Sequence, residues 1–125
     1  MSFNIRNLVI LSFALFAYVY GKCRTSGATY GTPANRARAS QALQSVCAEL
    51  AGTYGASETK STCRDSPENV RFNFVLQHVK NGQRVIDANE CMDGMNKEIT
   101  GCNQGGDTTY TNWRYSVDPN TGLCQ

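Results

Sequence analysis

The sequence has 125 residues, with 12 Lys and Arg against 10 Asp and Glu, and a formal net charge of +2. This length corresponds to one domain, since single domains typically contain about 100–200 residues. The lysines and arginines are spread along the sequence and do not form a cluster. Because binding to nucleic-acid phosphates depends on clustered positive charge, nucleic acid is excluded as an expected partner.

The N-terminal segment 1–21 has the features of a secretory signal peptide. Arg6 precedes an apolar run over residues 8–20, and the small residues Val19 and Gly21 occupy the −3 and −1 positions of a cleavage site. The apolar run is shorter than the roughly 20 residues that span a membrane. We therefore expect a secreted, extracellular mature chain, residues 22–125, with no membrane anchor.

Six cysteines lie in the expected mature chain: Cys23, Cys47, Cys63, Cys91, Cys102 and Cys124. An even number in a secreted chain predicts three disulfides, and the spacing leaves most pairings open. Cys91 and Cys102 flank one predicted helix and would lie roughly 16 Å apart, beyond the ~7 Å limit for a disulfide. No Cys-x-x-Cys motif or Cys/His cluster is present, so we expect neither a metal site nor a cofactor.

Two segments have helical signals. The first lies between Thr32, a suitable N-cap followed by Pro33, and Gly52, which would end the helix. Its apolar residues at three- and four-residue spacing are Ala39, Leu43, Val46, Cys47 and Leu50. The second begins at Asp87, with Glu90 three residues on as in a capping box, and ends at Gly101. Its apolar face contains Cys91, Met92, Met95 and Ile99.

The remaining segments predict strands and loops. Residues 53–69 are polar and predict a loop fixed by Cys63. Alternation over 70–78 and the Asn81-Gly82 pair predict a β-hairpin of about 70 to 86. In the last segment Trp113, Tyr115 and Val117 alternate with polar residues, which predicts a strand with one buried face, and 118–122 predicts a turn. The order is helix, strand, strand, helix, strand.

The chemistry of an enzyme site is missing from the sequence. His78 is the sole histidine and is expected to be a half-buried residue that points inward at a strand end, without an oriented partner. Asp93 and Glu98 do not share a helical face, so they do not form the carboxylate pair of a glycosidase. We assign Asp87, Glu90 and Asp107 to caps and loops, and expect no catalytic residue.

The segment 103–114 combines aromatic rings with planar polar side chains, the materials of a sugar-binding site. The candidate glycan-binding residues are Asn103, Gln104, Asp107, Tyr110, Asn112 and Arg114. By the two-residue period of a strand, Tyr110, Asn112 and Arg114 are expected on the face opposite to Trp113 and Tyr115.

The motifs "CAELAGTYG", "ECMDGMNKEITGC" and "GGDTTYTNWRYSVDPNTGLC", which together span about 45–124, resemble the fungal secreted Y3-like glycan-binding domain family. The resemblance implies a lectin-like protein without catalytic activity, often a homodimer, with glycans or glycoproteins as partners in fungal defence or cell-surface recognition. Together with the elements above, it implies an α+β fold: a disulfide-stabilised sandwich of two helices packed on an antiparallel sheet of about four strands.

The competing class is a small cysteine-rich toxin or effector of the killer-toxin-like type. The expected mature chain has no Lys-Arg or Arg-Arg site, which argues against a processed toxin but leaves an unprocessed effector open. A structural surface protein is a third class.

Overall fold

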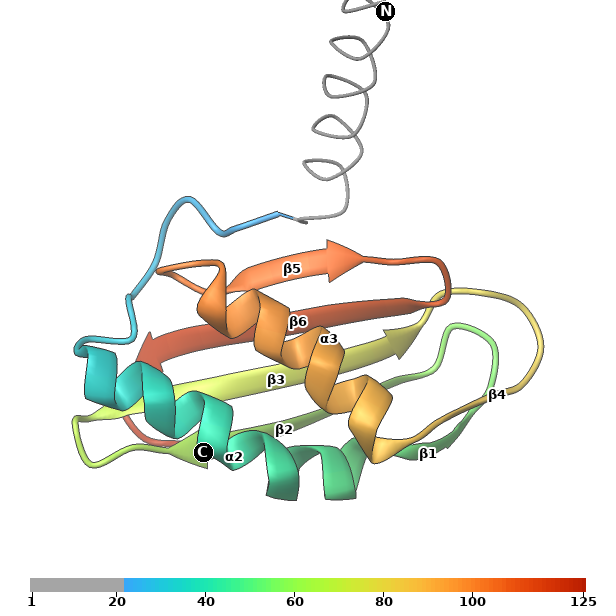
Figure 1. Ribbon diagram of the computed structural model, residues 1–125, viewed down its shortest axis with the longest axis horizontal. Coiled ribbons are helices and arrows are strands. Elements are labelled where there is room, and N and C mark those ends of the chain that lie inside the picture. Colours follow the sequence, from blue (N-terminus) through green and yellow to red (C-terminus); the bar gives the residue numbers. More distant parts are fainter. Residues whose placement is uncertain (1–21) are drawn as a thin grey trace, which may run out of the picture.

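The computed structural model describes residues 22–125, so the predicted signal peptide lies outside the described residues. The elements are α2 (Pro33–Leu50), β1 (Gly52–Tyr54), β2 (Thr59–Asp65), β3 (Val70–His78), β4 (Arg84–Ile86), α3 (Ala88–Thr100), β5 (Gly106–Thr109) and β6 (Trp113–Thr121). The main sheet is antiparallel with strand order β2-β3-β6-β5, and β1 pairs with β4 in a small second sheet. Both helices lie side by side on one face of the main sheet (Figure 1), which confirms the predicted α+β fold.

The helices begin and end where the sequence predicts. The Thr32 hydroxyl accepts from the Asn35 N–H, and the Asp87 carboxylate accepts from the Glu90 N–H. After α2 the chain leaves through Gly52 at φ 130°, a conformation that favours glycine. The predicted apolar residues of α2 are all buried.

The core lies between the helices and the main sheet. On β3, Phe72, Phe74 and Leu76 point toward the helices, while on β6 Trp113, Tyr115 and Val117 do the same. Each such side chain contributes about 1.5–3 kcal/mol when fully buried. The prediction that Trp113, Tyr115 and Val117 form the buried face of the last strand is confirmed.

The predicted hairpin over 70–86 is wrong. β3 pairs with β2 and β6, whereas β4 pairs with β1. The Asn81-Gly82 signal determines only a local change of direction, with Gly82 at φ 80°. A central strand gains more from two long partners than from the three-residue β4 that follows it in sequence.

The predicted loop over 53–69 is also wrong, because it contains β1 and β2. β2 is an edge strand that contains no apolar residue other than Cys63. It therefore shows no two-residue hydrophobic pattern. Its charged side chains nevertheless cover the helix side. Lys60 Nζ lies 4.3 Å from the Tyr54 ring centroid, and Arg64 donates to Glu49 of α2 at 2.9 Å.

The predicted turn over 118–122 is instead largely the end of β6, which continues to Thr121. β5 pairs with β6 only as far as Val117, so Pro119 lies where β6 has β3 as its sole strand partner. Proline is tolerated on such edge segments because its missing N–H breaks fewer sheet bonds there. A turn signal in the sequence therefore marks the end of two-sided pairing.

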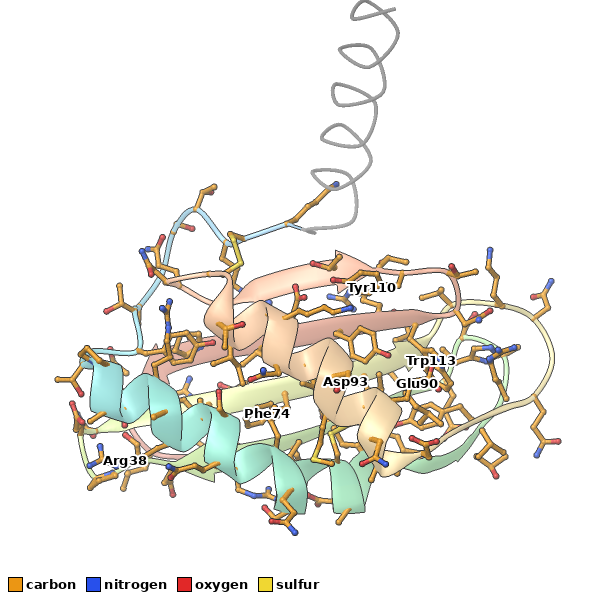
Figure 2. The ribbon with its side chains drawn as sticks, viewed as in Figure 1. Arg38, Phe74, Glu90, Asp93, Tyr110 and Trp113 are labelled. Carbon is orange, nitrogen blue, oxygen red and sulfur yellow. A yellow bond between two sulfur atoms is a disulfide. The ribbon has the colours of Figure 1, made fainter. Side chains whose placement is uncertain are left out.

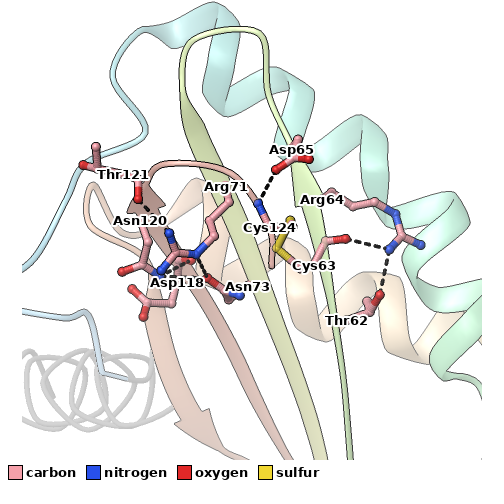
Figure 3. The surroundings of a disulfide bond; sticks show 10 residues. All are labelled: Thr62, Cys63, Arg64, Asp65, Arg71, Asn73, Asp118, Asn120, Thr121 and Cys124. Carbon is pink, nitrogen blue, oxygen red and sulfur yellow. Dashed lines mark hydrogen bonds between the residues drawn. A yellow bond between two sulfur atoms is a disulfide. The ribbon is translucent and has the colours of Figure 1, made fainter.

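Three disulfides are present, as predicted: Cys23–Cys102, Cys47–Cys91 and Cys63–Cys124. The second joins the two helices, and the other two attach the chain ends to the domain. Cys91 and Cys102 do not pair, which confirms the geometric exclusion. Figure 3 shows Cys63–Cys124 beside Asn73, Arg71 and Asp118 on the face of the sheet opposite to the helices.

Candidate functional site

A groove of about 540 Å³ lies between α3 and the connection from β5 to β6. We call it the α3 groove. Its lining residues come from three segments: Asp87, Asn89, Glu90, Asp93, Gly94 and Lys97 from α3 and its cap, Tyr110, Thr111 and Asn112 from the connection, and Trp113 and Tyr115 from β6. In Figure 2 the labelled Glu90 and Asp93 lie on α3, and Tyr110 and Trp113 lie beside it.

The turn between β5 and β6 gives the groove one of its walls. The Tyr110 N–H donates to the Trp113 carbonyl at 2.8 Å, and the Val79 N–H donates to the Asn112 carbonyl at 2.9 Å. These two bonds fix both ends of the turn. As a result Tyr110 packs against the core cluster on the helix side of the sheet.

Two tyrosine rings form the floor of the groove. The Tyr110 and Tyr115 centroids are 5.8 Å apart in an edge-on arrangement, and Lys97 Nζ lies 5.1 Å from the Tyr110 centroid. Gly94 lets Tyr115 approach the helix, since a Cβ there would lie 2.2 Å from the Tyr115 ring. Tyr110 remains partly exposed, so one of these rings is accessible to a ligand.

Trp113 also lines the groove, although it is 2% exposed. Its ring packs edge-on against Tyr54 and beside His78, each at 5.1 Å between centroids. Within residues 22–125 its Nε1 has no hydrogen-bond partner. A buried donor without a partner is unfavourable by about 1–3 kcal/mol, and this one lies beneath the accessible surface of the groove.

The α3 wall is acidic. Asp87 is used as the helix cap, whereas Glu90 and Asp93 are exposed, lie three residues apart on the same helix face, and form no ion pair within the described part of the chain. Burial, followed by the nearby Glu90 carboxylate, raises the pKa of the Tyr115 hydroxyl above its usual range. Glu90 and Asp93 can therefore accept hydrogen bonds at the edge of an aromatic floor.

The six predicted site residues occupy three places in the structure. Tyr110 and Asn112 line the α3 groove. Asp107 and Arg114 lie on the open face of the main sheet, where the Arg114 Nε and Nη2 donate to the two Asp107 oxygens at 2.8 and 2.6 Å. That hydrogen bonding raises the pKa of the Arg114 guanidinium, and Arg24 adds a contact to Asp107 at 3.9 Å.

Asn103 and Gln104 lie at the third place, near the N-terminal segment. The Arg36 Nη2 donates to Asn103 Oδ1 at 2.8 Å, and the Gln104 Nε2 donates to the Gly27 carbonyl at 2.9 Å. The expectation that Tyr110 shares a face with Arg114 is wrong. The strand period starts at Trp113, and the turn before it reverses the direction of the Tyr110 side chain.

Sequence reasoning missed the contribution of α3. The sequence patterns assign Glu90 to a helix cap, exclude Asp93 with Glu98 as a carboxylate pair, and give Lys97 no role. A signal was present: Glu90, Asp93 and Lys97 follow each other at three- and four-residue spacing on one polar helix face. The sequence could not show that this helix face lies against the connection between β5 and β6.

One further expectation concerns His78. It is a strand-end residue that points inward, as predicted, but it is 1% exposed and not half-buried, and its Nδ1 lies 3.0 Å from the Gly55 carbonyl. Over residues 22–125 no group of three or more His, Cys, Asp or Glu residues is arranged to hold a metal ion. The helices of this same part are too short or too polar to cross a membrane.

Comparison with protein-family models matches residues 38–124 to the model described as Glycan binding domain Y3. The matched range includes all of the α3 groove and most of α2. Comparison with curated proteins finds no match.

Proposed function

The chain belongs to the glycan binding domain Y3 family, and we propose that it is a secreted lectin-like protein that binds glycans in the α3 groove. The binding is non-covalent and requires no metal, cofactor or catalytic residue. The single observation behind this assignment is the partly exposed Tyr110 ring, which lies beside the exposed carboxylates of α3 in one groove.

This combination matches the chemistry of a pyranose ring. The sugar has an apolar C–H face that packs on an aromatic ring, and its hydroxyls donate to carboxylates and accept from amides. Glu90 and Asp93 would accept, while Asn112 would donate. The groove volume of about 540 Å³ lies within the usual range for small-ligand sites.

The open sheet face is the weaker candidate. Arg114 and Asp107 already satisfy each other, and Arg24 donates to the Ser116 hydroxyl at 2.7 Å. A ligand would have to replace these bonds before it gained new ones. The same face contains no tyrosine, tryptophan or phenylalanine within the main sheet, so it has no ring on which a sugar could pack.

A glycan array on the oxidised protein, followed by calorimetry with the best ligand, tests the proposal. Tyr110→Ala should weaken binding at least tenfold, because the ring on which the sugar packs is removed, whereas Tyr110→Phe should retain most of it. Arg114→Ala is the matched control on the open sheet face and should leave affinity unchanged. Loss with Arg114→Ala and none with Tyr110→Ala would place the site on the open face instead.

Secretion rests on the signal-peptide features of residues 1–21 and on the three disulfides, which persist in oxidising compartments. Expression in a eukaryotic host should release a chain whose N-terminal sequence begins at Lys22. Light scattering of that material measures whether it forms the homodimer that the family resemblance implies. Recovery only from the cell interior would contradict the secretion proposal.

The proposed biological role is recognition of cell-surface glycans, as in fungal defence. A lectin of this kind should bind yeast or plant cells in a sugar-competable manner without permeabilising them. Dye entry into those cells at concentrations that saturate binding would favour the toxin or effector class.

A further inference from the structure

A second hollow, of about 510 Å³, lies at the start of α2. It is bounded by residues 29–32, the first turns of α2 and the end of α3, and we call it the Arg36 pocket. Its side chains include one cation, Arg36, and the hydroxyls of Thr29, Ser40 and Thr100. No acidic residue is among those that line it.

Arg36 is held in place by two contacts. Its Cζ lies 5.3 Å from the Tyr30 ring centroid, and its Nη2 donates to Asn103 Oδ1 at 2.8 Å. Tyr30 is itself 3% exposed, so the surface beneath the guanidinium is rigid. An arginine that is ordered before binding loses less side-chain entropy when a ligand arrives.

Arg36 also differs from the other arginines near it. Arg38 pairs with Glu68 at 2.6 Å and Arg24 with Asp118 at 3.6 Å. In the described range 22–125, no carboxylate lies within 4.0 Å of Arg36. Glu68, which accepts a hydrogen bond from Thr32 of the pocket lining, is already neutralised by Arg38.

The backbone N–H groups at the N-terminus of α2 are not what would bind the ligand. The Asn35 N–H is capped by Thr32, and the Arg36 N–H donates to the Thr32 carbonyl, so most of the first-turn donors are used. A second, independent feature is the Tyr30 hydroxyl. Tyr30 lines the pocket, and its buried hydroxyl has no hydrogen-bond partner in the described range.

We propose that the Arg36 pocket binds the carboxylate of an acidic sugar, a uronic acid residue of a glycan. A planar guanidinium with free N–H groups matches a planar carboxylate with two parallel hydrogen bonds. One arginine in an otherwise uncharged pocket balances one negative charge. The surrounding hydroxyls and the Asn103 amide supply partners for the sugar hydroxyls.

The proposal rests on the proposed function only in that the ligand is a sugar, since its site is separate from the α3 groove. The two can fail independently. Neutral glycan binding that depends on Tyr110 would stand even if uronate did not bind at Arg36. Uronate binding that depends on Arg36 would stand even if the α3 groove bound nothing.

The test is a titration of the ¹⁵N-labelled oxidised protein with sodium galacturonate, galactose and sodium acetate at constant ionic strength, followed by NMR. Galacturonate should shift the amides of residues 29–40 and 100–103, and galactose should not. Arg36→Gln should weaken galacturonate binding at least tenfold, and Arg36→Lys should recover part of it. Arg84→Gln, which removes one exposed charge on β4, should change nothing.

Three results would overturn the proposal. One is galacturonate binding that is unchanged in Arg36→Gln. Another is a set of shifts confined to the α3 groove. The third is equal binding of acetate and galacturonate, which would show that the pocket recognises a carboxylate but no sugar.

Discussion

The α3 groove and the Arg36 pocket each contain the same kind of side-chain pair, a tyrosine with a cation over its ring. Lys97 lies 5.1 Å from the Tyr110 centroid, and Arg36 lies 5.3 Å from the Tyr30 centroid. They differ in which partner is accessible. Tyr110 is partly exposed, whereas Tyr30 is 3% exposed and its ring supports Arg36.

Exposure of the tyrosine therefore determines what each site offers a ligand. In the groove the ring itself is available and the wall is acidic, which suits the C–H face and hydroxyls of a neutral sugar. In the pocket the ring is covered and the cation is available, which suits an anion. Three changes to the chain, ordered from the largest expected effect to the smallest, test this contrast, and a fourth tests a buried carboxyl outside both sites.

Replacement of the inter-helix disulfide should destabilise the helix pair that carries both sites. Cys47–Cys91 joins α2, which forms a wall of the pocket, to α3, which forms a wall of the groove. Removing a native disulfide from a small secreted domain typically costs about 2–5 kcal/mol. We expect Cys47→Ser with Cys91→Ser to lower the free energy of unfolding by that amount, measured by urea denaturation. Unchanged stability would show that packing alone holds the helices together.

Gly94→Ala should damage the groove and spare the pocket. The new Cβ would lie 2.2 Å from the Tyr115 ring, so the ring or the helix must move. Overpacking of this kind costs about 1–3 kcal/mol. Thermal unfolding should show the loss, and galacturonate shifts at residues 29–40 should persist. Gly55→Ala is the control, because a Cβ there meets only the Glu58 carboxylate at 3.7 Å.

Neutralising the acidic wall should weaken binding in the groove alone. With Glu90→Gln and Asp93→Asn together, sugar hydroxyls lose charged acceptors, which form stronger hydrogen bonds than neutral ones. We expect roughly a tenfold loss of neutral glycan affinity, about 1.4 kcal/mol, by calorimetry. The control pair Glu58→Gln and Asp65→Asn removes the same charge from positions outside the groove. Equal losses in both pairs would show that net charge, and not the wall, controls affinity.

Glu98→Gln should change the pH dependence of stability without affecting either site. Glu98 is buried, accepts a hydrogen bond from Thr108, and lines neither hollow. Burial raises the pKa of its carboxyl, so the folded state binds the proton more tightly than the unfolded chain. Its contribution to stability is greatest below the usual glutamate pKa of about 4.3 and is lost as the pH rises through the raised value.

Urea denaturation over a pH series should therefore show the wild type losing stability above about pH 4.3 while Glu98→Gln does not. Glu49→Gln is the opposite control. Hydrogen bonds from Thr62 and then Arg64 lower the pKa of the Glu49 carboxyl, so its contribution is present at neutral pH and lost in acid. Parallel curves for the wild type and Glu98→Gln would contradict the assigned shift.

Local signals in the sequence predicted the parts of the fold that local interactions decide. The caps at Thr32 and Asp87 and the apolar spacing in α2 and α3 identified both helices. Alternation identified the buried half of β6. The polar edge strand β2 was missed because its pattern contains no apolar period, and the Asn81-Gly82 turn was misinterpreted because pairing partners are chosen over the whole sheet.

Two of the candidate residues from the sequence, Tyr110 and Asn112, line the α3 groove, but their predicted neighbours lie elsewhere. The six candidates are close in sequence, yet the turn at 110–112 and the two faces of β6 separate them into three places. Glu90, Asp93 and Lys97 join Tyr110 because α3 packs across the end of the β5–β6 hairpin.

The sequence by itself determined the helices, the buried strand face, the presence of three disulfides and the residue types suited to sugars. These depend on capping, periodicity and composition, which act within a few residues along the chain. The tertiary structure alone decided the strand order, the cysteine pairing and which of two tyrosines is accessible. Those features depend on contacts between residues far apart in sequence, where burial against a distant element sets what each side chain can bind.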